Sequence, residues 1–180
     1  MTLPDHFALF ALPARFAIDE AALAHAYKEV QGRVHPDRFA AGTAAERRVA
    51  MQWAARANEA YATLRSPLKR AGYLCERAGV SIDAESNTAM PPAFLMQQME
   101  WREALDEARA ERDHAALAQL VAQTDAERVR LVADIGTAID ERADAAAAAP
   151  LVRQLMFVER FGDELRAAEQ AAPPVSPASA

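Results

Sequence analysis

The chain has 180 residues, about half of them apolar, which is enough for one domain or two small ones with a core that needs no disulfide or metal. Its one cysteine, Cys75, excludes an internal disulfide and a cysteine-cluster zinc site, and its apolar setting favours an unreactive buried thiol. Because the net charge is −6 and no stretch resembles a membrane span or a signal peptide, we expect a cytoplasmic protein with no nucleic-acid or membrane partner.

The first long helix is predicted to begin at Asp19, a favourable N-cap residue. Apolar side chains then recur at steps of four, three and four, which places them on one face: Leu23, Tyr27, Val30 and Val34. Pro36 disfavours helical geometry at His35, so the helix should end just before His35-Pro36-Asp37.

A second long helix is predicted to follow, because Thr43 and Glu46 have the spacing of a capping box. Its apolar face comprises Val49, Trp53, Ala57, Tyr61 and Leu64. The two faces predict a pair of antiparallel helices, joined by a polar loop that carries His35-Pro36-Asp37.

Ser66 and Pro67 suit the start of a third helix, which Gly79 could close. Three further helices are expected, at about 92–110, 113–149 and 150–172, with Pro150 taken as the break after an alanine run. Gly136 and Gly162, inside these helices, suggest close packing. We therefore predict an all-α chain whose parts are 1–78, a linker or elbow at 79–91, a three-helix bundle at 92–172 and a disordered tail at 173–180.

The helix after Pro92 has more apolar residues than one buried face needs. Its core face comprises Phe94, Trp101, Leu105 and Ala108. Leu95, Met96 and Met99 fall on a different side, and Phe157 in the last helix lies off the face formed by its neighbours Leu151, Leu155, Val158 and Leu165. Such a surplus indicates either a docking surface or helices buried on two sides, and periodicity does not separate the two.

His35-Pro36-Asp37 between two long antiparallel helices resembles the J-domain co-chaperones. Other segments resemble one branch of them, the HscB family of bacterial iron–sulfur cluster assembly: residues 58–61, 64, 66–67, 70–74, 93–100 and 152–157. The resemblance implies a J-domain, with a short first helix within residues 5–13, joined to a C-terminal three-helix bundle. Met99 departs from a usual leucine, and Trp101 is bulkier than expected at its position.

The resemblance also implies two sets of binding residues. The set expected to contact the ATPase of a DnaK-class chaperone, HscA, comprises His35, Pro36, Asp37, Lys28, Arg33 and Arg38. The set expected to bind the iron–sulfur scaffold, IscU, comprises Leu95, Met96, Met99, Glu100, Arg102, Glu103 and Phe157. From the residues alone, the basic side chains could equally be ordinary solvated charges.

Three other functions were weighed. A J-domain protein could serve a different client through the same bundle, and a helical spacer would need no contact at His35. An enzyme is disfavoured, because the four histidines (His6, His25, His35 and His114) are scattered and no phosphate-binding loop or metal-ligand spacing occurs. We therefore expect no catalytic residue, no metal and no cofactor.

Overall fold

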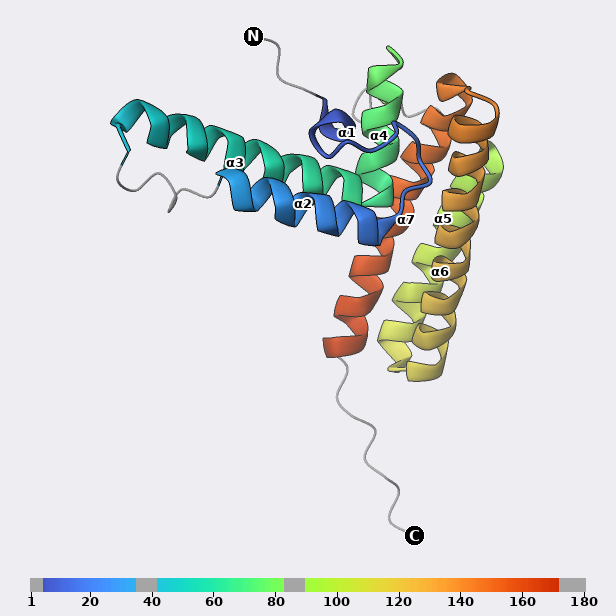
Figure 1. Cartoon of the computed structure of the whole chain (residues 1–180). Helices are drawn as coiled ribbons and strands as arrows, with labels where there is room; N and C mark the ends of the chain where they lie inside the picture. The colour runs from blue at the N-terminus through green and yellow to red at the C-terminus, as the bar shows by residue number, and fades with distance from the viewer. Residues whose placement is uncertain (1–4, 35–41, 83–89, 172–180) are drawn as a thin grey trace. The chain divides into compact units, whose positions relative to one another are not determined.

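The computed structural model describes residues 5–34, 42–82 and 90–171. All elements in these ranges are helical, which confirms the predicted all-α class. They are α1 (His6–Leu9), α2 (Glu20–Val34), α3 (Ala44–Arg65), α4 (Pro67–Arg77), α5 (Pro92–Glu111), α6 (His114–Gly136), the short π-helix η2 (Thr137–Glu141) and α7 (Ala145–Ala171) (Figure 1). Within the same ranges, no helix has the length and apolar character needed to cross a membrane.

The chain forms two compact units. The first contains Met1–Ser81 together with Ile135–Ala148, and the second contains Ile82–Asp134 and Ala149–Ala180. The first unit therefore includes the segment that joins α6 to α7, which lies far from the rest of the unit in sequence.

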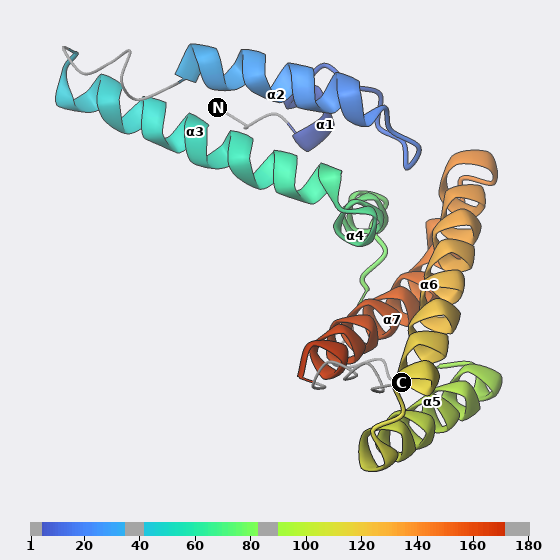
Figure 2. The same ribbon diagram turned by 90° about the horizontal axis from the view of Figure 1, so that it is seen from below.

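In the first unit, α2 and α3 run antiparallel, side by side in both ribbon views (Figures 1 and 2). Their shared core also takes in α1, and its buried members are Phe7, Phe10, Leu23, Ala60 and Leu64. The rings of Tyr27 and Tyr61 stack across the two helices, with centroids 4.1 Å apart. The predicted helical pair is therefore correct.

Three of the predicted helix starts are also confirmed. At each of them, a side chain close in sequence caps the first turn. Asp19 accepts hydrogen bonds from the N–H groups of Ala21 and Ala22. Thr43 and Glu46 form the complete capping box, and Ser66 caps α4 with Pro67 in the first position. After α4, Gly79 adopts a φ of 77°, the left-handed conformation that ends helices.

One predicted face needs correction at its beginning. Val49 is 51% exposed, whereas Ala50 beside it is only 4% exposed. The buried positions of α3 are Ala50, Ala57, Ala60 and Leu64. The prediction followed the larger side chain, whereas alanine takes the buried position, so the true face is rotated by one residue in the first turns of α3.

A carboxylate fastens the joining segment into the first unit. Asp140 in η2 accepts hydrogen bonds from the backbone N–H groups of Phe16 (2.6 Å) and Ala17 (2.7 Å), and its side chain is 8% exposed. The Phe16 ring lies against Gly136, where a Cβ atom would come within 3.3 Å of it. The guanidinium of Arg70 lies 5.0 Å from the centre of the same ring. Close packing therefore explains Gly136, but its neighbour is Phe16 in the segment before α2 and not another helix, as was expected.

Cys75 lies in the same unit and is fully buried, as expected, with its Sγ 3.7 Å from the carbonyl oxygen of Ala145. Burial raises the pKa of this thiol, which keeps it protonated and unreactive.

In the second unit, α5, α6 and α7 pack together as a bundle (Figure 2). All four residues predicted for the core face of α5 are buried: Phe94, Trp101, Leu105 and Ala108. Trp101 stacks on Phe161 with ring centroids 5.8 Å apart, so the bulky side chain has a partner in α7. By contrast, the atoms nearest a Cβ on Gly162 belong to Arg166 of the same helix, which gives no evidence of close packing between helices there.

The predicted boundary between the last two helices is wrong. α6 ends at Gly136, and α7 begins at Ala145 after Asp144, which accepts a hydrogen bond from the N–H of Ala147. Pro150 lies inside α7. The alanine run is thus the start of a helix whose cap is Asp144, and the helix continues past the proline because its first turns are already formed and packed.

We predict that Asp140→Ala lowers the free energy of unfolding by about 2 kcal/mol, because it leaves two backbone N–H groups without their charged acceptor. Urea unfolding followed by circular dichroism measures the change. Glu141→Ala is the matched control, since Glu141 is the exposed neighbour. Equal unfolding midpoints for the two variants would show that the Asp140 contacts contribute nothing.

A pH dependence is predicted for His6, which is buried and stacks on Tyr73. Burial, followed by the positive charge of Arg56, lowers its pKa from the ordinary 6.5. The fold therefore favours neutral His6, so this stability is present above pH 6.5 and is lost as the pH falls below it. Urea unfolding at about pH 7.5 and about pH 5.5 should show a smaller loss for His6→Phe than for the unmodified chain; equal losses would contradict the assignment.

Candidate partner-binding surfaces

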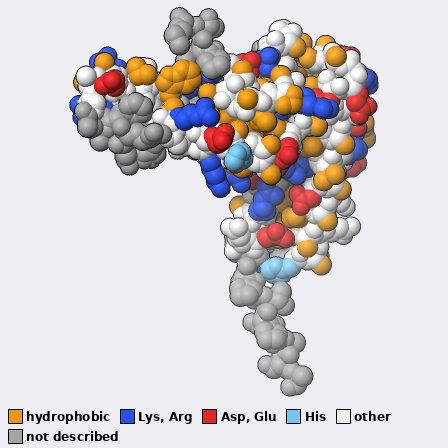
Figure 3. Space-filling view, in the orientation of Figure 1, with side chains coloured by type: hydrophobic (Ala, Val, Ile, Leu, Met, Phe, Trp, Pro, Cys, Tyr) orange, Lys and Arg blue, Asp and Glu red, His pale blue; other side chains and the backbone are white. Residues whose placement is uncertain are grey.

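The first candidate surface is the loop end of the α2–α3 pair. Four of its predicted residues, His35, Pro36, Asp37 and Arg38, lie outside the described residues. The other two, Lys28 and Arg33, are exposed on α2. Figure 3 shows Lys and Arg side chains on the surface of this pair of helices. The described helices end and restart on either side of the tripeptide, at Val34 and Ala44.

Side-chain hydrogen bonds fix α2 against α3 near this end. Gln31 donates to the hydroxyl of Tyr27 (2.7 Å) and to the Oδ1 atom of Asn58 (2.6 Å), and Tyr27 donates to the same Asn58 atom (2.9 Å). These hydrogen bonds fix how α2 is rotated about its own axis relative to α3, and so fix the direction in which Lys28 is displayed. This role of Gln31 and Asn58 could not be predicted from the sequence, because polar residues on a helix give no periodic signal.

Two apolar side chains at the start of α3 were also not predicted as surface residues. Val49 is half exposed, and Met51 is 55% exposed. Their exposure follows from the rotation of the buried face described above, which places Ala50 in the interior instead.

The second candidate surface is a strip on α5. Leu95, Met96 and Met99 are 43%, 63% and 63% exposed, whereas the core residues of the same helix are buried. Of the explanations left open by the sequence, burial on a second side within the bundle is therefore wrong for these three side chains. Glu100, Arg102 and Glu103 are exposed beside them and give the strip a charged border.

Phe157 has a different position from the one expected. Its ring packs edge-on against Phe94 (5.9 Å between centroids) and stacks with Phe161 (5.8 Å), so it is half-buried at the edge of the core. The guanidinium of Arg102 lies 5.7 Å from the centre of its ring. Phe157 thus lies at the boundary of the core, where one side of its ring contacts core residues. Its contact with Arg102 places it beside the α5 strip.

The predicted scaffold-binding residues divide into two rows along α5. Leu95, Met99 and Arg102 are spaced by four and three residues and form the row on the side of Phe157. Met96, Glu100 and Glu103 have the same spacing and form the neighbouring row. Met96 and Glu100 also line a groove that α6 and α7 complete.

Within the described ranges, no group of three or more His, Cys, Asp or Glu side chains is arranged to hold a metal ion.

Comparison with known proteins relates the chain to a single family. The family described as "HSCB C-terminal oligomerisation domain" matches residues 90–166. A protein of Bordetella parapertussis named co-chaperone protein HscB homolog is 59% identical over 169 residues, which cover 94% of this chain and 98% of that protein. The structure of chaperone HscB from Vibrio cholerae matches with a TM-score of 0.83 and 33% identity, over 94% of this chain and all of that one. The human co-chaperone HscB matches with a TM-score of 0.87 and 26% identity, over 93% of this chain and 83% of that one.

Proposed function

Because the chain belongs to the HscB family of co-chaperones, we propose that it is a non-enzymatic adaptor with two binding ends. One end stimulates the ATPase of a DnaK-class chaperone, HscA. The other binds the iron–sulfur scaffold IscU and delivers it to that chaperone for cluster maturation and transfer.

At the chaperone end, the proposed contacts are His35, Pro36 and Asp37, with Lys28, Arg33 and Arg38 beside them. The exposure of Lys28 and Arg33 supports this part of the proposal, because neither side chain is used within the core. Preferential contact with the ATP-bound chaperone would promote hydrolysis, whereas equal affinity for every state would shift nothing. Proline restricts the backbone of the loop and lowers the entropy lost on binding.

The scaffold end rests on one observation, which is the exposure of Leu95, Met96 and Met99 on a helix whose other face is buried. Apolar side chains gathered on a surface are typical of binding sites, and a few of them usually dominate the affinity. The charged border of Glu100, Arg102 and Glu103 would then set the orientation of the partner.

Binding both partners on one chain would raise the concentration of the scaffold near the chaperone. The adaptor would thus act by bringing the scaffold close to the chaperone and by contacting the chaperone's ATPase. Neither role needs a catalytic residue on the adaptor.

We predict that His35→Gln abolishes stimulation of the HscA ATPase while binding of IscU remains unchanged, because the two ends are separate. The test is the steady-state rate of ATP hydrolysis by HscA, measured with the variant alone, with IscU alone and with both present. His25→Gln is the control, since His25 is exposed on α2 and lies outside the proposed contacts. Full stimulation by His35→Gln would disprove the chaperone contact.

At the other end, combined Leu95→Ala, Met96→Ala and Met99→Ala should weaken IscU binding at least about tenfold, as expected for buried anchors of an interface. These three side chains are exposed in the free protein, so their truncation should leave the unfolding temperature nearly unchanged. Phe157 is left intact because it packs on Phe94 and Phe161. Isothermal titration calorimetry measures the affinity. An unchanged dissociation constant would mean that the scaffold binds elsewhere, and retained ATPase stimulation would then favour a different client.

A further inference from the structure

A groove in the second unit extends from the α5 strip towards α6. Its volume is about 630 Å³, and it is open to solvent along one side. Met96 and Glu100 belong both to the groove and to the predicted scaffold-binding set. The residues that complete it are Pro91, Ala93, Phe94 and Gln97 near the start of α5, Glu127 and Arg130 in α6, and Gln154 in α7.

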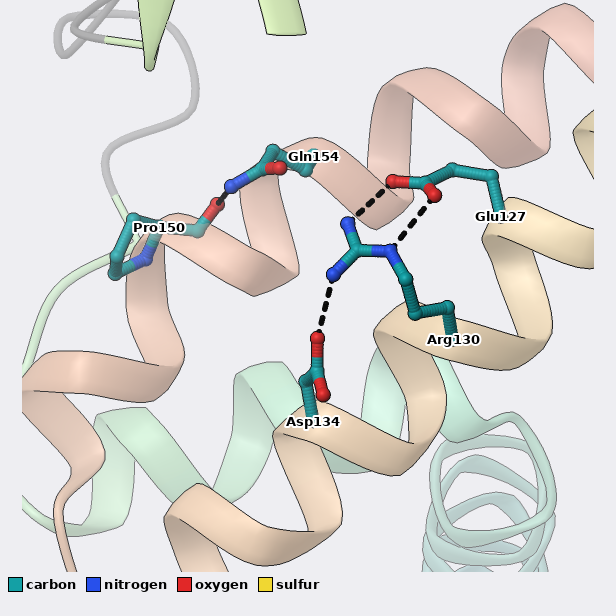
Figure 4. A network of polar contacts seen from close by, with 5 residues as sticks. All are labelled: Glu127, Arg130, Asp134, Pro150 and Gln154. Carbon is teal, nitrogen blue, oxygen red and sulfur yellow. Dashed lines mark hydrogen bonds and ion pairs between the residues drawn. The ribbon is translucent and has the colours of Figure 1, made fainter. Parts of the chain in front are cut away.

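The α6 wall of this groove is held by an ionic network (Figure 4). Arg130 donates from Nε (2.8 Å) and Nη2 (2.5 Å) to the two carboxylate oxygens of Glu127, and from Nη1 (2.6 Å) to Asp134. The Glu127 side chain is only 12% exposed. Its hydrogen bonds raise the pKa of Arg130 further above the ordinary value, so the guanidinium remains charged.

The network makes the groove acidic. Two carboxylates, Glu127 and Asp134, share one guanidinium, and Glu100 adds a further negative charge on the α5 side. Arg130 faces an acidic carboxylate on each side and already donates three hydrogen bonds, so it is poorly placed to attract an acidic partner. Gln154, the α7 residue that lines the groove, is neutral, and its amide donates to the carbonyl of Pro150 in its own helix (3.3 Å).

We propose that this groove is the second part of the scaffold-binding surface, and that it receives an apolar side chain of IscU next to a lysine or arginine. The inference rests on the proposed function, because it names the partner of the same surface. Continuity supports it, since Met96 and Glu100 line both parts. Charge complementarity supports a basic segment, since an acidic one would meet Glu100 and Glu127.

In this arrangement each residue has a distinct role. Met96 provides an adaptable apolar contact at the edge of the groove. Glu100 accepts hydrogen bonds from the basic group, and Glu127, whose two oxygens already accept from Arg130, contributes its negative charge. Arg130 is a positioning residue, because it holds the Glu127 carboxylate in place before the partner arrives and so lowers the ordering cost of binding.

Two variants test the groove by calorimetry with purified IscU. Ala93→Trp places a large side chain in the groove from an exposed position, and should weaken binding at least about tenfold. Glu127→Gln keeps the shape of the wall and removes its charge, and should weaken binding about threefold at low salt, with a smaller salt dependence than the unmodified chain. Ala126→Trp is the control, because Ala126 is exposed beside Glu127 but lies outside the groove.

The outcomes separate this inference from the proposed function. Weaker binding by both variants, with unchanged binding by Ala126→Trp and unchanged unfolding temperatures, supports the groove. Normal binding by both variants, while the α5 triple alanine variant binds weakly, overturns the groove and leaves the proposed function intact. If only Ala93→Trp weakens binding, the basic segment is wrong. If the triple alanine variant also binds normally, the proposed function itself fails.

Discussion

Two neighbouring backbone N–H groups, those of Phe16 and Ala17, donate to one carboxylate that lies more than 120 residues away in sequence, at Asp140. The Phe16 contact is partly buried, where an N–H group without an acceptor costs free energy, and a charged acceptor stabilises both N–H groups more than a neutral one. This contact is supported by the packing of Phe16 against Gly136 and beneath Arg70. The segment around Asp140 joins α6 to α7. The unit that carries α2 and α3 therefore also includes residues Ile135–Ala148, which are distant in sequence.

In the proposed function, the two faces of α5 separate stability from binding. One face carries Phe94, Trp101 and Leu105 into the core, and the other exposes Leu95, Met96 and Met99. Changes in the exposed strip can therefore alter affinity with little effect on folding. Phe157 lies between the two faces, since its ring contacts the core and supports Arg102. A substitution there changes both properties together, so loss of binding by a Phe157 variant alone does not identify a contact.

Sequence reasoning succeeded where the cause is local. The caps at Asp19, Thr43 and Ser66 use side chains within three residues of the groups they bind, and the core face of α5 follows from helical periodicity. It failed at Ala50, because the prediction assigned the buried position to the larger Val49 beside it. It also failed at Pro150, because the alanine run concealed the cap at Asp144. Asp140 and Arg130 gave no signal, because their importance depends on partners that only the folded chain brings together, or on a groove formed by three helices.

The composition of the α5 strip fits the proposed delivery role. An adaptor that hands its client to another protein needs enough affinity to capture it and a dissociation rate fast enough to release it, and affinity differences between related complexes appear mostly in dissociation. Flexible methionines at Met96 and Met99 provide apolar contact without rigid shape complementarity, whereas branched or aromatic anchors would favour a more permanent interface. The fixed charges at Glu100 and Glu127 would then contribute to the rate of encounter and to orientation more than to residence time.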